Sequence, residues 1–234
     1  MAIRFVVPIA LREVMEELLP QFQQMSGCSV DVQHMLNPEV PAYATSGNGW
    51  DIAITNPIHV QEMMAAQTAR CDVHLPFGRS PLAFGKLGSS PVAPARDPER
   101  TAEILTSVES IAITDVGTSG DQFRNLAGQL EIWELIESRV VGLEGGGPMR
   151  ALLAGEVELA GLPLTNIAPV PGVQCVASCP EGWNVHIDLS IALNDSADAA
   201  TRRLADWLMQ PALDERLAQL GANRFRLPAL QETL

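Results

Sequence analysis

Short apolar segments of strand type alternate with amphipathic helical segments along most of the chain. Residues 3–7 form an apolar run interrupted only by Arg4, and the apolar side chains between Leu11 and Met25 then recur at helical spacing. A strand followed by a helix recurs from residue 50 and again from residue 111. This alternation predicts an α/β fold in which mainly parallel sheets carry helices on both faces.

The segment 111–123 is the strongest local motif of the chain. An apolar strand runs into Gly117-Thr118-Ser119-Gly120, and a helix is expected to begin near Asp121. We expect both glycines to adopt backbone angles that other residues avoid, so that successive N–H groups converge. The hydroxyl groups of Thr118 and Ser119 and the positive end of the helix dipole would add to an anion-binding loop. The alternative is an ordinary loop in which Ser119 only caps the helix.

A second glycine-rich loop, residues 144–148, precedes a helix expected from Met149. Pro148 suits the first turn of that helix. The backbone at Gly146 and Gly147 can approach a ligand closely because these residues have no side chain, although a simple turn explains the same residues. We therefore name Thr118, Ser119, Gly146 and Gly147 as candidate ligand contacts.

The charge balance restricts the partners of the chain. The sequence has 28 acidic and 15 basic residues, a net charge of −13, and Lys86 is its single lysine. This balance argues against nucleic acid and against an anionic membrane surface. A small anion would have to be held by local dipoles and a few arginines.

Four cysteines, Cys28, Cys71, Cys175 and Cys179, are too scattered to form a disulfide framework. Cys175 and Cys179 with His186 lack the further ligand that zinc usually takes, so we expect no metal and no cofactor.

No stretch reaches the roughly 20 apolar residues of a membrane span. Residues 3–7 are too short for the apolar core of a signal peptide, so the chain as written is expected to be cytoplasmic, or periplasmic if an export signal has been removed.

Two further segments are expected to cross between structural units. One contains a short strand around residues 82–84 after Phe77-Gly78-Arg79-Ser80-Pro81, and the other is a long strand at residues 185–193. Asn194-Asp195-Ser196 is expected to cap the next helix. Arg79 could bind a carboxylate in bidentate fashion or form a salt bridge between the units.

The other candidate ligand contacts lie where strands end, which is where open α/β sheets bind ligands. Thr55 and Asn56 follow a strand, although an Asn-Pro helix start explains them equally well. Arg12 follows the first strand and either points into a cleft or lies in solvent. His186, with Asp188 two residues on, is the candidate acid or base, and a structural histidine is the alternative.

These features, in this order along the chain, resemble the type 2 periplasmic binding proteins of the molybdate-binding group. The resemblance rests on the first strand-loop-helix unit, Trp50-Asp51-Ile52-Ala53-Ile54, Gly117-Thr118-Ser119-Gly120, the glycine-rich loop before Met149 and the closing segment Asp206-Trp207-Leu208-Met209-Gln210-Pro211. It is closest to the branch that contains aconitate isomerase, on the Gly-Thr-Ser-Gly segment and the Pro-Val-Pro-Gly-Val turn at 169–173.

The resemblance implies two α/β lobes, residues 1–78 with 190–234 and residues 79–189, with a ligand in the cleft between them. It also places Ile9 and Ala10 of the first loop at the ligand. Where a molybdate binder of this group has a serine in that loop, this chain has Pro8-Ile9-Ala10. A tetrahedral oxyanion would lose one hydroxyl donor there.

Two functions follow as hypotheses. In the first, the cleft binds a small di- or tricarboxylate or an oxyanion, closes by a hinge and releases it unchanged, with an ABC transporter as partner only if the protein is exported. In the second, the same loops hold an unsaturated polycarboxylate while a base moves a proton, as in an aconitate isomerase. The lack of an export signal favours the second hypothesis, and the lack of an evident catalytic constellation favours the first.

Overall fold

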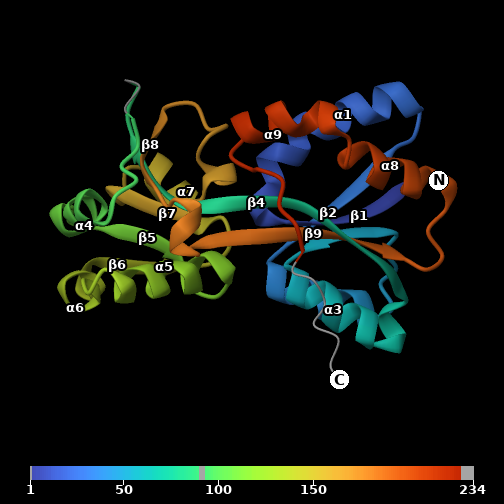
Figure 1. Cartoon of the computed structure of the whole chain (residues 1–234), viewed down its shortest axis with the longest axis horizontal. Coiled ribbons are helices and arrows are strands. Elements are labelled where there is room, and N and C mark those ends of the chain that lie inside the picture. The colour runs from blue at the N-terminus through green and yellow to red at the C-terminus, as the bar shows by residue number, and fades with distance from the viewer. Residues whose placement is uncertain (1, 90–92, 228–234) are drawn as a thin grey trace.

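The computed structural model describes residues 2–89 and 93–227, which form two lobes joined by two long strands (Figure 1). The strands are β1 (Ile3–Pro8), β2 (Val30–Met35), β3 (Ile52–Thr55), β4 (Cys71–Leu87), β5 (Ile111–Thr114), β6 (Val140–Leu143), β7 (Leu159–Pro163), β8 (Val173–Ser178) and β9 (His186–Asn194). The α/β fold predicted from the alternation of segments is confirmed.

The sheet order is β2-β1-β3-β9-β4-β7-β5-β6, and β8 pairs with β4. Strand β1 is parallel to β2 and β3 in one lobe, and β5 is parallel to β6 and β7 in the other. The crossing strands β4 and β9 are antiparallel to each other and to their other neighbours. Each lobe therefore has a parallel part, and the antiparallel pair joins the two.

The crossing strand β4 is much longer than the sequence pattern suggests. We expected a short strand around residues 82–84, whereas β4 extends from Cys71 to Leu87. The expectation was wrong because Pro76, Gly78 and Pro81 interrupt the apolar pattern. Irregular pairing with β9 between Pro76 and Gly78 accommodates this interruption, so the strand continues through it.

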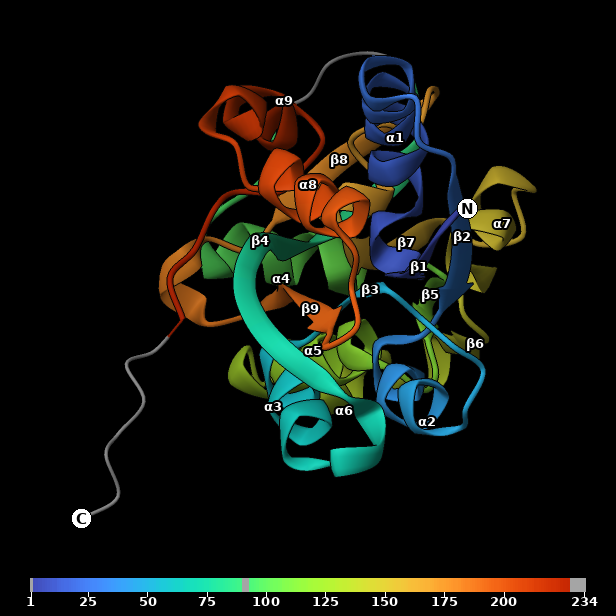
Figure 2. The same cartoon turned by 90° about the vertical axis from the view of Figure 1, so that its right-hand side faces the viewer.

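The helices cover the faces of the two sheets. The α-helices are α1 (Arg12–Ser26), α2 (Val40–Thr45), α3 (Pro57–Ala65), α4 (Pro98–Ser107), α5 (Thr118–Gln129), α6 (Trp133–Ile136), α7 (Gly147–Leu153), α8 (Ala199–Leu208) and α9 (Asp214–Gln219). The 3-10 turns are η1 (Ile9–Leu11), η2 (Asn37–Glu39), η3 (Gln67–Ala69), η4 (Glu137–Arg139), η5 (Leu164–Asn166), η6 (Glu181–Trp183) and η7 (Pro211–Leu213). In the first lobe, α1, α8 and α9 lie on one face of the sheet, and α2 and α3 lie on the other (Figure 2).

Side chains of successive strand residues pack into separate hydrophobic cores on the two faces of each sheet. Phe5 and Val7 pack into the core under α1, α8 and α9, whereas Val6 between them packs into the core with α2 and α3. Ile111 and Ile113 face α4, α5 and α6, whereas Ala112 faces α7. The cores thus divide the chain into two lobes. The exact boundaries, 1–78 with 190–234 for one lobe and 79–189 for the other, stay a prediction. Residues 228–234 lie outside the described part.

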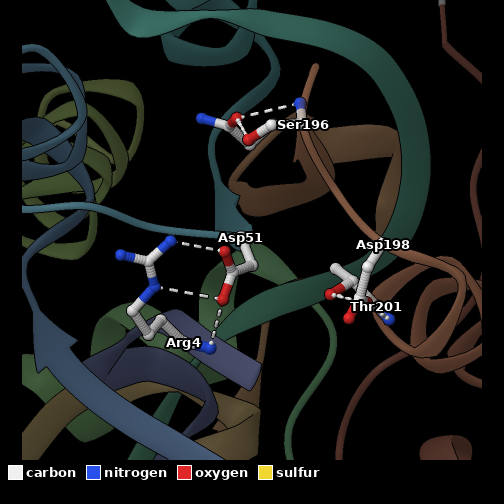
Figure 3. Close-up of polar contacts among 6 residues, drawn as sticks. Arg4, Asp51, Ser196, Asp198 and Thr201 are labelled. Carbon is white, nitrogen blue, oxygen red and sulfur yellow. Dashed lines mark hydrogen bonds and ion pairs between the residues drawn. The ribbon is translucent and has the colours of Figure 1, made fainter. Parts of the chain in front are cut away.

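Helix ends follow the expected capping chemistry in part. Gly27 ends α1 in the left-handed conformation (φ 69°), and Pro20 lies inside that helix. The predicted cap of α8 was wrong: the N-cap is Asp198, whose carboxylate accepts a hydrogen bond from the N–H of Thr201. Asn194 instead accepts hydrogen bonds from Ser196, so it closes the turn that follows β9 (Figure 3).

An ion pair fixes the start of β1 against the segment before β3 (Figure 3). The Arg4 guanidinium donates to both carboxylate oxygens of Asp51, at 3.1 and 2.6 Å, and the Arg4 N–H donates to Asp51 as well. Burial raises the pKa of Asp51, but the hydrogen bonds from Arg4 outweigh it, so the pKa lies below its usual value. This pair is a structural support far from the cleft.

Candidate functional site

A cavity of about 250 Å³ lies between the lobes, where the loops after several parallel strands meet. Its first-lobe wall comes from η1, the start of α1 and the loop after β2, and its second-lobe wall comes from the loops after β5, β6 and β7. The lining residues are Ile9, Ala10, Arg12, Glu13, Leu36, Asn37, Thr114, Gly117, Thr118, Ser119, Gly145, Gly146, Met149, Arg150, Leu153, Leu162, Pro163, Asn166 and Ile187. Strand ends of this kind are the usual ligand site of open α/β sheets.

The Gly-Thr-Ser-Gly segment is itself the first turn of α5. The helix begins at Thr118 and not near Asp121, because Gly117, with φ 145°, serves as the N-cap. No side chain caps this end, so the first N–H groups of the helix have no intrahelical partner, and Gly117, Thr118 and Ser119 line the cavity. Ser119 is therefore not the N-cap, and the alternative that explained it by capping is wrong.

Gly120 is required by a close contact and not, as predicted, by an unusual backbone angle. Its φ is not positive, but a Cβ atom at this position would lie 1.9 Å from the carbonyl oxygen of Thr114. Only glycine lets the backbone of α5 approach the end of β5 this closely. The close approach holds the first turn of the helix at the cavity.

The two hydroxyl groups of this turn have different surroundings. The Thr118 hydroxyl donates to Asn56 Oδ1 at 2.7 Å, which joins the second lobe to the first. Ser119 lines the cavity and makes no hydrogen bond through its side chain within the described part of the chain. Ser119 is thus the hydroxyl group that remains available to a ligand.

The two predicted glycines of the β6–α7 loop also differ. Gly146 lines the cavity as the N-cap of α7, with φ 78°. Gly147 donates its N–H to the carbonyl of Glu144 at 2.8 Å, and a Cβ here would lie 2.7 Å from that of Leu143. Gly147 therefore packs against β6, outside the set of cavity-lining residues, and α7 begins there and not at Met149.

The first loop lies at the cavity, as the resemblance implied. Ile9 and Ala10 line it, and their carbonyl groups accept hydrogen bonds from Asn166 Nδ2 at 3.1 Å and Thr165 Oγ1 at 2.5 Å. Arg12 also lines the cavity, and its guanidinium has no ion-pair partner among the residues described. The first loop thus contributes an unpaired positive charge and two contacts between the lobes.

Three predicted residues hold the structure around the cavity without lining it. The buried Thr55 hydroxyl donates to the Asn37 carbonyl at 3.0 Å, and Asn56 Nδ2 donates to the Asp188 carbonyl at 2.7 Å. Arg79 binds both oxygens of Asp188, at 2.6 and 2.9 Å, and also Glu181. Arg79 thus forms the salt bridge that was the alternative to a ligand contact. This salt bridge joins the crossing strands β4 and β9.

His186 lies on the other side of β9 from the cavity. Ile187 faces the cavity, whereas His186 and Asp188 line a separate open hollow with Asn56 and Thr118. Its Nε2 lies 3.7 Å from Asp188, and its buried Nδ1 has no hydrogen-bond partner in the described structure. Burial lowers the pKa of His186 most, Asp188 opposes this shift, and Arg79 adds to it.

We predict that this histidine makes the protein less stable as the pH falls below about 6.5, its pKa in an unfolded chain. The unfolded chain then takes up a proton more readily than the folded one, so protonation favours unfolding until the pH reaches the lower folded pKa. His186→Gln should reduce the loss of unfolding free energy between about pH 7.5 and about pH 5.5 in urea titrations. An unchanged loss would contradict the prediction.

Four residues with chemical roles at the cavity were missed from the sequence. Glu13, Asn37, Arg150 and Asn166 all line it. Asn37 Oδ1 is buried without a hydrogen-bond partner in the described structure. Asn37 and Asn166 follow β2 and β7 closely, so their positions after strand ends were the signal that could have found them.

Within the described residues, the structure gives no support for a metal centre. No group of three His, Cys, Asp or Glu side chains in residues 2–89 and 93–227 is placed to hold a metal ion. Burial raises the pKa of Cys175 to about 11 and that of Cys179 to about 12, so both thiols stay protonated near neutral pH.

Within residues 2–89 and 93–227, no helix is long and apolar enough to cross a membrane.

Two α/β lobes, two crossing strands and an interlobe cavity at strand ends define a type 2 periplasmic-binding-protein fold. The chain belongs to the bacterial extracellular solute-binding protein family, whose model matches residues 3–222. No curated protein sequence matches the chain.

Solved structures show the same fold at low sequence identity. The periplasmic molybdate-binding protein of Azotobacter vinelandii has a TM-score of 0.76 and 15% identity, over 97% of this chain and 99% of that one. The sulfate-binding protein SubI of Mycobacterium tuberculosis has a TM-score of 0.69 and 15% identity, over 95% and 86%. Peb3 of Campylobacter jejuni has a TM-score of 0.67 and 10% identity, over 95% and 100%.

Proposed function

We propose that the chain is a solute-binding protein that holds a small anion, a carboxylate or an oxyanion, in the cavity between its lobes. The observation that carries the proposal is the convergence of positive groups from both lobes. Arg12 comes from the first lobe, and the uncapped first turn of α5 and Arg150, which is ion-paired with the exposed Glu144, come from the second. Charged donors and helix N-termini of this kind stabilise a bound anion in spite of the negative net charge of the protein.

The structural neighbours support this proposal by their ligands. They include proteins described as binding molybdate and sulfate, and a PEB3 structure is described as bound to L-phospholactate. The fold thus accommodates both inorganic and organic anions. An exported form of this protein would deliver its ligand to an ABC transporter, and a form that stays in the cytoplasm would work without one.

The isomerase alternative and the relation to the aconitate isomerase branch stay predictions. His186 was the proposed base, and it lies across β9 from the cavity. An anion bound against Arg12 and Ser119 would therefore not contact this imidazole in the present arrangement. We favour binding without turnover for this reason.

The test is a thermal-shift screen of oxyanions and of di- and tricarboxylates, followed by titration calorimetry of each anion that raises the melting temperature. We predict that Ser119→Ala weakens binding of the best anion by about 1–3 kcal/mol, because a hydroxyl donor to a charged group is lost. Calorimetry on the purified variant measures this loss.

Ser46→Ala is a matched control for that substitution. The Ser46 hydroxyl donates to the Tyr43 carbonyl at 2.7 Å at the end of α2 and is absent from the cavity lining. Its removal should leave anion affinity unchanged. If no anion of either kind binds, or if Ser119→Ala binds like the wild type, the proposed site is wrong.

A further inference from the structure

The cavity contains a negative charge as well as the positive ones. Glu13, in the first turn of α1, lines it, and its Oε2 accepts a hydrogen bond from Asn166 Nδ2 at 2.7 Å. Within the described part of the chain Glu13 forms no ion pair, whereas Arg150 is paired with the exposed Glu144 at 2.8 Å. The carboxylate of Glu13 is therefore held in the cavity without a positive partner.

The carboxylate of Glu13 disfavours the binding of inorganic oxyanions more than that of organic carboxylates. Fully ionised sulfate and molybdate have acceptor oxygens on every side, so such an ion in this small cavity would bring oxygen atoms close to Glu13. Like charges brought together in a partly desolvated site repel each other strongly. An elongated organic acid can place its carboxylates away from Glu13 and present carbon to that part of the wall.

The remaining wall also suits carbon better than an inorganic ion. Five apolar side chains line the cavity: Ile9 and Leu36 from the first lobe and Met149, Leu153 and Leu162 from the second. Apolar side chains gain from burying a carbon skeleton and offer no hydrogen bond to an ion.

Hydroxyl donors are also scarce in this cavity. The Thr118 hydroxyl is engaged with Asn56, and the first loop has no serine. Arg12 and Arg150, in contrast, offer planar groups of donors that match the two oxygens of a carboxylate. The two arginines come from opposite lobes, so Arg12 would bind one carboxylate of the ligand and Arg150 the other, in exchange for its ion pair with the exposed Glu144.

We propose that the ligand is an organic di- or tricarboxylate whose carbon skeleton lies on the apolar wall, and that Glu13 excludes sulfate- and molybdate-type oxyanions. This inference rests on the proposed function and narrows it to one ligand class. It assigns to Glu13 a role in specificity, and to Arg12 and Arg150 the role of binding the two ends of the ligand.

The test is titration calorimetry with succinate, glutarate and tricarballylate against sulfate and molybdate. The wild type should bind at least one carboxylate ten times or more tightly than either inorganic ion, since the like-charge penalty applies to the latter. Glu13→Gln keeps the acceptor for Asn166 and removes the charge, so sulfate or molybdate affinity should rise about tenfold or more. Arg12→Gln should lower carboxylate affinity about tenfold or more.

Glu16→Gln is the matched control. Glu16 is exposed on the same helix and absent from the cavity lining, and its substitution changes the net charge by the same amount. It should leave every affinity unchanged. Tighter binding of sulfate or molybdate than of all three carboxylates by the wild type would overturn the inference and leave the proposed anion site standing. An unchanged inorganic affinity in Glu13→Gln would overturn the role of Glu13, and absence of binding by every anion would overturn the proposed function as well.

Discussion

Gly120→Ala is expected to destabilise the protein by about 3 kcal/mol or more, at or above the upper end of typical overpacking costs. The new Cβ would lie 1.9 Å from the Thr114 carbonyl oxygen, which is backbone and cannot rotate away. Either α5 must move away from the end of β5 or the strand must shift. Urea unfolding followed by circular dichroism measures the loss, and anion affinity should fall too because the first turn of α5 leaves the cavity.

Gly128→Ala provides the control in the same helix. A Cβ at Gly128 would meet nothing within 4 Å, and its φ is not positive. The substitution should therefore raise stability by about 0.5–1 kcal/mol, the difference in helix propensity between the two residues. If both variants were equally stable, the close contact between α5 and β5 would not be the reason for glycine at position 120.

The double substitution Thr165→Val with Asn166→Leu is expected to weaken anion binding by roughly 10- to 100-fold. It removes the hydrogen bonds from η5 to the carbonyl groups of Ala10 and Ile9 and to the carboxylate of Glu13. These bonds join the second lobe to the first beside the cavity. Without these bonds, a smaller fraction of the protein is in the closed arrangement, in which both walls of the cavity meet. The apparent affinity for the anion falls in proportion to that fraction.

Small-angle scattering distinguishes this opening from the loss of a ligand contact. The double variant without ligand should have a larger radius of gyration than the wild type, and saturating ligand should reduce it. Thr106→Val is the control, since its hydroxyl donates to the Ala102 carbonyl inside α4. Identical scattering of wild type and double variant would show that these bonds do not hold the lobes together.

The sequence was sufficient for the fold because its signals are local. Mostly apolar runs such as residues 3–7 and 111–114 stand out against amphipathic neighbours, and each forms a strand. The extent of β4 was not visible in this way, because its pairing with β9 is formed between residues about a hundred positions apart. Long-range pairing overrides the local interruption by proline and glycine.

The candidate site could be predicted at the level of loops but not of every side chain. The loops at Ile9, Thr118 and Gly146 all reach the cavity, as parallel strands require. Which hydroxyl is available to a ligand depends on the partner across the cleft: Thr118 meets Asn56, and Ser119 does not. Glu13 was overlooked because a glutamate in the first turn of a helix is explained by the helix dipole alone.

The register of the crossing strands has a consequence for how such a protein can be rebuilt. Arg79 of β4 pairs directly with Asp188 of β9, so the two strands that cross between the lobes lie side by side at this point. Everything between these two residues is thus an insertion with adjacent ends, the arrangement in which a foreign segment is most easily accommodated. Exchange of that insertion between relatives would replace the second-lobe wall of the cavity and keep the first-lobe wall, provided that Ile187, which packs in the first-lobe core, is retained.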